Sequence, residues 1–174
     1  MQQTQVPLLG FAAASGTGKT TLLEQIIPLI KAQGLRVGLI KKSHHNIQVD
    51  QPGKDSFRFR VAGGSPVMLC TSHGRVLITE FSKSAEPHLF EELQFFDQSQ
   101  VDLILVEGFK SECFPKIELH RAAVKEPLLY LNDPNIIALA TDSFLELPSN
   151  LVQLDINQPR AITDFIIKQF MGIL

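Results

Sequence analysis

Short apolar runs alternate along the chain with segments in which apolar residues recur every three or four positions. A near-continuous apolar run such as Val101–Val106 is typical of a strand that is buried on both faces of a parallel sheet. The expected strands cover residues 6–12, 35–40, 101–106, 116–120, 136–140 and 151–154, and the helices expected between them cover residues 21–34, 87–98 and 159–170. Strands that alternate with helices predict an α/β fold, with a mostly parallel sheet flanked by helices.

One short helix and one hairpin interrupt this alternation. The short helix is predicted from Asp55 to Ala62, where two glycines follow. Two apolar runs, Pro66–Thr71 and Arg75–Thr79, flank a glycine-containing turn and predict an inserted β-hairpin. In the first long helix, Pro28 predicts a bend, and Gly34 is expected to cap the C-terminus.

The first strand leads into Ala13-Ala14-Ser15-Gly16-Thr17-Gly18-Lys19-Thr20, and a helix follows. A glycine-rich turn that carries a lysine and a hydroxyl between a strand and a helix is typical of a phosphate-binding P-loop. Glycine has no Cβ, so the backbone can curl until several N–H groups meet phosphate oxygens, and the helix N-terminus adds partial positive charge. Alanine stands where the general pattern has its first glycine, at the position that closes the strand. The segment predicts a nucleotide-binding site formed by Ser15, Gly16, Thr17, Gly18, Lys19, Thr20 and Thr21.

Individual side chains of this site have distinct expected roles. Lys19 reaches the β and γ phosphates, the Thr20 hydroxyl ligates a bridging Mg²⁺ ion, and Thr21 contacts the α phosphate. Glu107 directly follows a buried strand, where P-loop proteins place an acidic residue that holds the magnesium ion through water. The same position also suits a carboxylate that orients the attacking water, or an ordinary surface acid at a strand end. Asp102, the rival acid, opens that strand and is expected at the wrong edge of the sheet.

Several further residues are open to two interpretations. Lys41 ends the second strand, where its ammonium either neutralises phosphate or is simply solvated. Asp55 either approaches the magnesium ion or caps its helix. Asp142 follows a strand at the same sheet edge and either accepts hydrogen bonds from a guanine ring or forms a turn, because no complete N-K-x-D signature is present. His44 and His45, adjacent and without a nearby third ligand, fit polar loop residues better than a metal site.

Composition narrows the class of protein. A formal net charge of −2 gives no broad attraction to nucleic acid or anionic lipid, and no apolar run approaches the length of a membrane span. Cys70 and Cys113 stand alone, without C-x-x-C spacing or a supporting cluster, which predicts reduced thiols in a cytoplasmic protein. The N-terminal segment has no basic residues before its apolar run, so a signal peptide is not expected. The 174 residues contain no linker or low-complexity stretch, so a single nucleotide-binding domain is expected over residues 1–174.

Four segments together are more specific than a P-loop alone. They are the loop Ala12–Thr21, Ile40-Lys41 before the histidine pair, Pro52–Ser56, and Asp102–Lys110. On these segments the chain resembles the molybdopterin-guanine dinucleotide biosynthesis protein B family over nearly its whole length.

The resemblance implies a GTP-binding adapter with weak intrinsic GTPase activity. The implied partners are GTP with Mg²⁺, the separate guanylyltransferase that attaches GMP to molybdopterin, molybdopterin itself and the maturation proteins of molybdoenzymes. The family also implies a homodimer, with the hairpin near residues 66–80 as the candidate contact between subunits. The resemblance also implies that Gly16–Thr21 form the phosphate-binding loop and that Glu107 is the acidic partner of the magnesium ion. Asn46 stands where the family often has a carboxylate, so no metal-linked role is expected there.

Two other functions are compatible with a P-loop. A small-molecule kinase needs an arginine-rich lid, whereas the region after Glu107 offers Arg121, far along the sequence. The absence of an evident arginine finger also predicts slow turnover of GTP. A metal-delivery protein would use the nucleotide as a switch and hold its metal through His44 and His45.

Overall fold

The computed structural model describes residues 4–43 and 49–173, so His44, His45 and Asn46 lie outside the described residues. The contacts of the chain group into two compact units, Met1–Lys42 with His88–Leu174, and Ser43–Pro87. The single domain expected over the whole chain stays a prediction.

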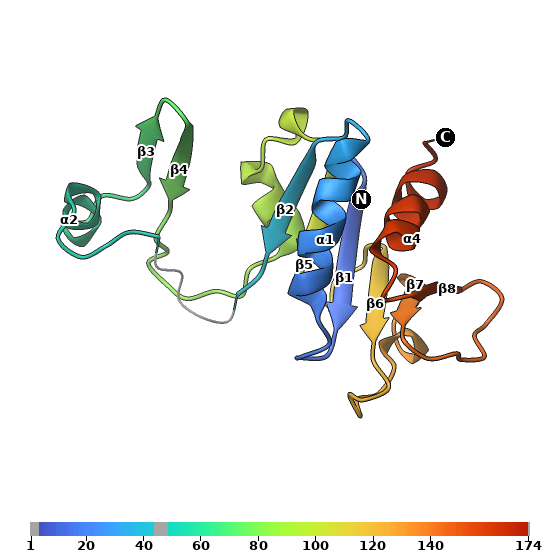
Figure 1. Cartoon of the computed structure of the whole chain (residues 1–174). Coiled ribbons are helices and arrows are strands. Elements are labelled where there is room, and N and C mark those ends of the chain that lie inside the picture. Colours follow the sequence, from blue (N-terminus) through green and yellow to red (C-terminus); the bar gives the residue numbers. More distant parts are fainter. Residues whose placement is uncertain (1–3, 44–48, 174) are drawn as a thin grey trace. The chain divides into compact units, whose positions relative to one another are not determined.

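The first unit is built on a six-stranded sheet with the strand order β2-β5-β1-β6-β7-β8, in which every neighbouring pair is parallel (Figure 1). The strands are β1 (Leu8–Ala13), β2 (Val37–Lys41), β5 (Leu103–Glu107), β6 (Lys116–His120), β7 (Ile136–Thr141) and β8 (Val152–Asp155). All six predicted strands are confirmed, with ends that differ by at most two residues from the expected ranges. Because the strands run in parallel, their carboxyl ends meet at one edge, where α/β folds bind ligands.

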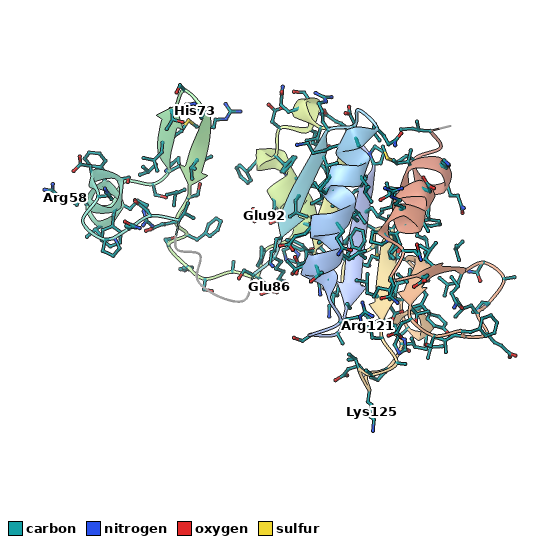
Figure 2. The ribbon with its side chains drawn as sticks, viewed as in Figure 1. Arg58, His73, Glu86, Glu92, Arg121 and Lys125 are labelled. Carbon is teal, nitrogen blue, oxygen red and sulfur yellow. The ribbon has the colours of Figure 1, made fainter. Side chains whose placement is uncertain are left out.

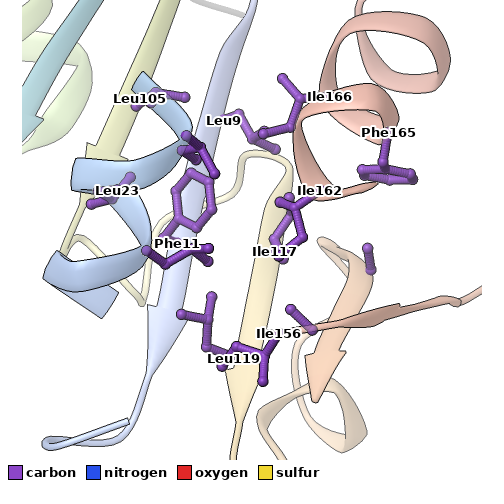
Figure 3. Packing of buried hydrophobic residues seen from close by; sticks show 14 of the residues in the cluster. Leu9, Phe11, Leu23, Leu105, Ile117, Leu119, Ile156, Ile162, Phe165 and Ile166 are labelled. Carbon is purple, nitrogen blue, oxygen red and sulfur yellow. The ribbon is translucent and has the colours of Figure 1, made fainter. Parts of the chain in front are cut away.

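Two helices cover one face of this sheet. They are α1 (Lys19–Ala32) and α4 (Pro159–Asp164), and α4 continues into a π-helical segment, η4 (Phe165–Phe170). Side chains such as Phe11 and Ile117 pack between the strands and these helices (Figure 3). The α1 helix continues through Pro28, and Gly34 follows its end with a φ of 80°. The Gly34 N–H donates to the Lys31 carbonyl, so the predicted glycine cap is confirmed.

The opposite face carries shorter elements than the sequence predicts. The helix expected over residues 87–98 is wrong in length: α3 (Leu89–Glu92) passes into the 3₁₀ turn η1 (Leu93–Phe95), and a second turn, η2 (Gln98–Gln100), follows. Phe96 leaves the helix in an extended conformation and lies against Gly38 of β2, where a Cβ would come within 2.5 Å of its ring. Packing of this ring overrides the helical periodicity. A last 3₁₀ turn, η3 (Leu129–Leu131), lies beside β7.

The second unit contains α2 (Asp55–Val61) and an antiparallel hairpin of β3 (Val67–Thr71) and β4 (Gly74–Ile78). The Thr71 hydroxyl accepts hydrogen bonds from the His73 and Gly74 N–H groups, which closes the predicted turn. Both the short helix and the hairpin are therefore confirmed. Within residues 4–43 and 49–173, no helix combines the length and the apolar character that crossing a bilayer requires.

Candidate functional site

The segment 14–18 forms a curled turn between β1 and α1. Gly16 and Gly18 have φ angles of 80° and 95°, in the left-handed region that glycine adopts without strain. Gly18 is the N-cap of α1, and its carbonyl accepts the first helical hydrogen bond from the Leu22 N–H at 3.0 Å. The buried Thr17 hydroxyl donates to the Ala14 carbonyl at 3.0 Å and ties the turn together. Ser15 and Gly16 are exposed, so the open side of the turn is accessible to a ligand.

Three lysines and one carboxylate lie together at the start of α1. Lys41 and Glu107 are register partners at the carboxyl ends of β2 and β5, and Lys41 Nζ lies 3.2 Å from a Glu107 carboxylate oxygen. The Glu107 side chain is only 14% exposed, which favours keeping a cation beside it. Burial lowers the pKa of Lys19, Glu107 opposes that shift, and Lys110 and Lys41 lower the pKa further. The cluster therefore carries an excess of positive charge next to the P-loop.

Lys110 is part of this cluster, although its role was not predicted. The chain turns sharply after β5, with positive φ angles at Gly108 and Phe109. A side chain at Gly108 would collide with Lys42, since its Cβ would lie 2.8 Å from the Lys42 Cβ. The turn returns Lys110 to β1, where its Nζ donates to the Ala13 carbonyl at 2.6 Å.

Arg121 is the second cation that sequence reasoning missed. It follows the carboxyl end of β6, as Figure 2 shows, and its Nε donates to the Thr17 carbonyl at 3.1 Å. Its Nη1 donates to a carboxylate oxygen of Asp142 at 3.4 Å and to the Asn157 side-chain oxygen at 3.2 Å. Arg121 meets the loop because β6 lies directly beside β1 in the sheet. The contact could not be predicted, since the two residues are far apart in the sequence.

Arg121 lines two of the cavities near the start of α1. One of about 270 Å³ lies at the start of α1, lined by Gly18, Thr21, Leu22, Gln25, Arg121, Ile156 and Asn157. The next, about 480 Å³, is lined by Thr141, Asp142, Ser143, Phe144, Gln153, Leu154, Asp155 and Asn157. A third of about 190 Å³ is lined by Arg121 together with Ala14, Lys110 and the buried Glu118. A separate cavity of about 520 Å³ is lined by Gln5, Phe96 and Ser99 at the opposite edge of the sheet.

Asp142 lies where it was expected, directly after β7, but its carboxylate is already engaged. One oxygen accepts the Ala122 N–H at 2.9 Å, and the other faces Arg121. The Ala122 N–H, together with Arg121, lowers the pKa of this carboxyl, so the carboxylate form is favoured. Direct recognition of guanine by Asp142 stays a prediction.

The remaining predicted residues fall in two places. Thr20 and Thr21 are exposed in the first turn of α1, beside Lys19. Asp55 lies in the second unit, where Lys54 is the N-cap of α2 and no side chain caps the helix. The interpretation of Asp55 as a helix cap is therefore wrong; it pairs instead with Arg58 at 3.6 Å. Its approach to magnesium stays a prediction. Among the described residues, no group of three histidine, cysteine or acidic side chains could hold a metal ion.

Asp102 behaves as expected for an acid at the other edge. Its carboxylate accepts hydrogen bonds from the Arg36 side chain at 2.7 and 3.1 Å. These bonds lower its pKa to about 2. Glu107 is thus the acid that lies at the P-loop edge.

Comparison with known proteins decides the family. A family model described as molybdopterin guanine dinucleotide synthesis protein B, MobB, matches residues 8–142. This chain belongs to that family. It is 48% identical to the molybdopterin-guanine dinucleotide biosynthesis adapter protein of Haemophilus influenzae, over 93% of this chain and 88% of the relative. It is 44% identical to the protein of the same name from Escherichia coli, over 95% of this chain and 94% of the relative.

Solved MobB structures share the fold. A crystal structure of Bacillus subtilis MobB superimposes with a TM-score of 0.74 at 24% identity, covering 94% of this chain and 97% of that one. A crystal structure described as molybdopterin-guanine biosynthesis protein B gives a TM-score of 0.69 at 22% identity, over 93% and 99% of the two chains. The resemblance stated from the sequence motifs, and the predicted parallel α/β sheet, are both confirmed.

Proposed function

We propose that this MobB family member is a cytoplasmic adapter in molybdopterin guanine dinucleotide biosynthesis that binds GTP with Mg²⁺ and assists the guanylyltransferase. Family membership and the names of the two close relatives support the adapter role. The observation that supports nucleotide binding is the curled turn at residues 14–18, with Lys19, Lys41 and Lys110 around it. Main-chain N–H groups at a helix N-terminus and an excess of ammonium groups suit a triphosphate.

The residues present fit a magnesium ion. Mg²⁺ keeps several waters and is bound through one or two protein oxygens together with phosphate oxygens. In this chain Thr20 would supply a hydroxyl and Glu107 a carboxylate, and the ion would neutralise charge on the phosphates. Lys41 is the present partner of Glu107, so it has to share that carboxylate or move to the phosphates when the ion binds.

Weak hydrolysis is the activity that suits these groups. Lys19 and the loop amides can stabilise charge on the γ phosphate, whereas Arg121 is engaged by the Thr17 carbonyl, Asp142 and Asn157. An arginine finger contributes several orders of magnitude to GTP hydrolysis, and a site without one turns over slowly.

The decisive experiment is a binding titration. Lys19→Ala should abolish tight binding of GTP, while Lys31→Ala, an exposed lysine in the last turn of the same helix, should not. Competition among GTP, ATP and GDP then measures base and phosphate preference. Unchanged GTP affinity in Lys19→Ala would refute the phosphate role. For the adapter role, the purified guanylyltransferase should be retained by immobilised protein, and no retention with or without GTP would contradict it.

We further propose that the second unit mediates a homodimer. A two-stranded hairpin is marginally stable alone, and this one exposes Met68 and Leu77 by 54% and 48%. Phe59 and Phe81 in the same unit are 62% and 72% exposed. So many exposed apolar side chains in a small unit are typical of an interaction surface, which a second copy of the chain would cover. Light scattering should give the mass of a dimer for the native chain, and that of a monomer for Leu77→Glu.

A further inference from the structure

Three carbonyl groups along the P-loop are each anchored by a side chain. Lys110 donates to the Ala13 carbonyl, the Thr17 hydroxyl donates to the Ala14 carbonyl, and Arg121 donates to the Thr17 carbonyl. In a planar trans peptide the C=O and the following N–H point in opposite directions. An anchor on the carbonyl therefore aims the next N–H away from the anchoring side chain.

Arg121 differs from the other two anchors because it is itself held by other elements. Its Nη1 reaches the Asp142 carboxylate after β7 and the Asn157 side chain after β8. The Asp142 carboxylate also accepts the Ala122 N–H, so the residue that follows Arg121 is fixed as well. A guanidinium is a planar, rigid fork of donors that can hold several acceptors in one geometry. We call Arg121, Asp142, Asn157 and the Thr17 carbonyl the arginine clamp.

We infer that Arg121 is a positioning residue that holds the P-loop in its phosphate-binding form, and that Asp142 acts on the nucleotide through Arg121. The clamp turns the Thr17 carbonyl toward β6 and thereby directs the Gly18 N–H to the other side of the loop. This role deepens the proposed function, since it rests on a triphosphate being the ligand of the P-loop.

The charge of Arg121 and its place beside the P-loop both support its role as a positioning residue. The side chains of Arg121 and Asp142 are 34% and 25% exposed, so their attraction is only partly screened by water. Arg121 also lines the cavity at the start of α1 together with Gly18 and Thr21. If Thr21 contacts the α phosphate as proposed, the guanidinium borders the phosphate chain, while its Nε donates to the Thr17 carbonyl of the loop itself.

The first test uses the nucleotide-free protein, so that it does not depend on GTP binding. ¹⁵N relaxation should give the Gly16 and Gly18 amides of the native chain order parameters near the value of about 0.85 typical of rigid backbone. In Arg121→Ala these values should fall toward the flexible range, below about 0.6. Arg121→Lys keeps the charge but lacks the planar fork of donors, so its order parameters at Gly16 and Gly18 should lie between those of the native chain and those of Arg121→Ala. Unchanged order parameters in Arg121→Ala overturn the inference.

A matched control exists at the opposite edge of the sheet. Arg36 donates to Asp102 and to the Ser99 carbonyl, a comparable set of partners remote from the P-loop. Arg36→Ala should lower the melting temperature without changing the order parameters of Gly16 and Gly18. Loss of order at the loop in this variant as well would mean that the effect is general destabilisation, and would count against the clamp.

The second test measures affinity for MgGTP, MgITP and magnesium tripolyphosphate. ITP lacks the 2-amino group of guanine, and tripolyphosphate has no base. Arg121→Ala and Asp142→Ala should each weaken all three ligands by a similar factor of about 10 to 100, the range expected for one charge-assisted hydrogen bond. The double variant should be no weaker than the stronger single variant, because both act through one contact.

The outcomes separate the inference from the proposed function. If Asp142→Ala weakens GTP, or GTP and ITP, and leaves tripolyphosphate unchanged, Asp142 reads the base directly and the inference fails, because ITP still carries the N1–H donor of guanine. If the native chain binds none of the three ligands, the proposed nucleotide function fails, whereas the relaxation measurement still decides whether Arg121 orders the loop.

Discussion

Lys116, at the start of β6, offers a perturbation whose size follows from its contacts. Its side chain is 2% exposed, and its Nζ donates to the Asp133 carboxylate at 3.0 Å and to the Glu112 carbonyl at 2.6 Å. The ammonium also lies 4.6 Å from the centre of the Phe114 ring. Lys116→Met keeps an unbranched apolar stem in the same space and removes the charge. The Glu112 carbonyl and one oxygen of the Asp133 carboxylate lose the ammonium as a donor.

Removing one partner of a buried ion pair costs about 3–5 kcal/mol when the remaining charge stays buried. Asp133 is 21% exposed and keeps hydrogen bonds from the Asn135 N–H and side-chain amide, at 2.9 and 2.8 Å. Part of the penalty is therefore relieved, and we expect a loss near the lower limit, about 3 kcal/mol in the free energy of unfolding. For a chain of this size that lowers the melting temperature by about 6–12 °C.

Urea unfolding followed by circular dichroism measures this free energy, with the exposed Lys125→Met as the control. Burial raises the pKa of Asp133, but the donors from Asn135 and Lys116 outweigh it and hold the pKa below 3.8. The resulting stabilisation is complete above 3.8, the pKa of the unfolded state, and is lost as pH falls through the lower pKa that Asp133 has in the folded state. The gap between native chain and Lys116→Met should hence narrow at acid pH. A loss at pH 7 within about 0.5 kcal/mol of the control would refute the reasoning.

Three further predictions concern pH and packing. Because burial lowers the pKa of Lys19 below 10.5, affinity for tripolyphosphate should fall with rising pH before pH 10.5 is reached. An affinity that stays constant up to pH 10.5 would contradict a role of the Lys19 ammonium in binding. Burial raises the pKa of Glu118 above 4.5, so between that value and the raised pKa the folded state binds more protons than the unfolded state, and the free energy of unfolding falls as pH rises through this range. Glu118→Gln should flatten this slope in urea unfolding, and an unaltered slope would exclude Glu118 as its source. Gly38→Ala places a Cβ 2.5 Å from the Phe96 ring and should cost about 1–3 kcal/mol, with partial recovery in a second variant that shortens Phe96 to leucine. Equal stability of Gly38→Ala and the native chain would show that the ring moves freely.

Much of the fold was predictable because its signals are short-range. The apolar runs of β1 and β5 and the helical stripe of α1 depend on residues a few positions apart, and so does the glycine turn between β1 and α1. The helix over residues 87–98 was overestimated, because Phe96 packs on β2, which lies about 60 residues away in sequence.

Part of the candidate site was predictable from the sequence for the same reason. Lys19 could be located because it follows Gly18 in the glycine-rich turn, and Glu107 because it ends a buried strand just before Gly108. Lys110 and Arg121 could not, since nothing near them in the sequence indicates which carbonyl they will meet. Their partners on the P-loop are 97 and 104 residues away.

The order of residues by itself determined the parallel α/β class, the hairpin and the glycine-rich turn before α1, since each is encoded by periodicity or by spacing within a short segment. The family was indicated by the resemblance of four separate segments. Only the tertiary structure decided that Lys110 and Arg121 anchor the P-loop carbonyls and that Asp142 is engaged with Arg121. The physical reason is the strand order, which places β5 and β6 on either side of β1 and so brings the residues after each strand to the same turn. A strand order is set by packing over the whole sheet, and no local pattern records it.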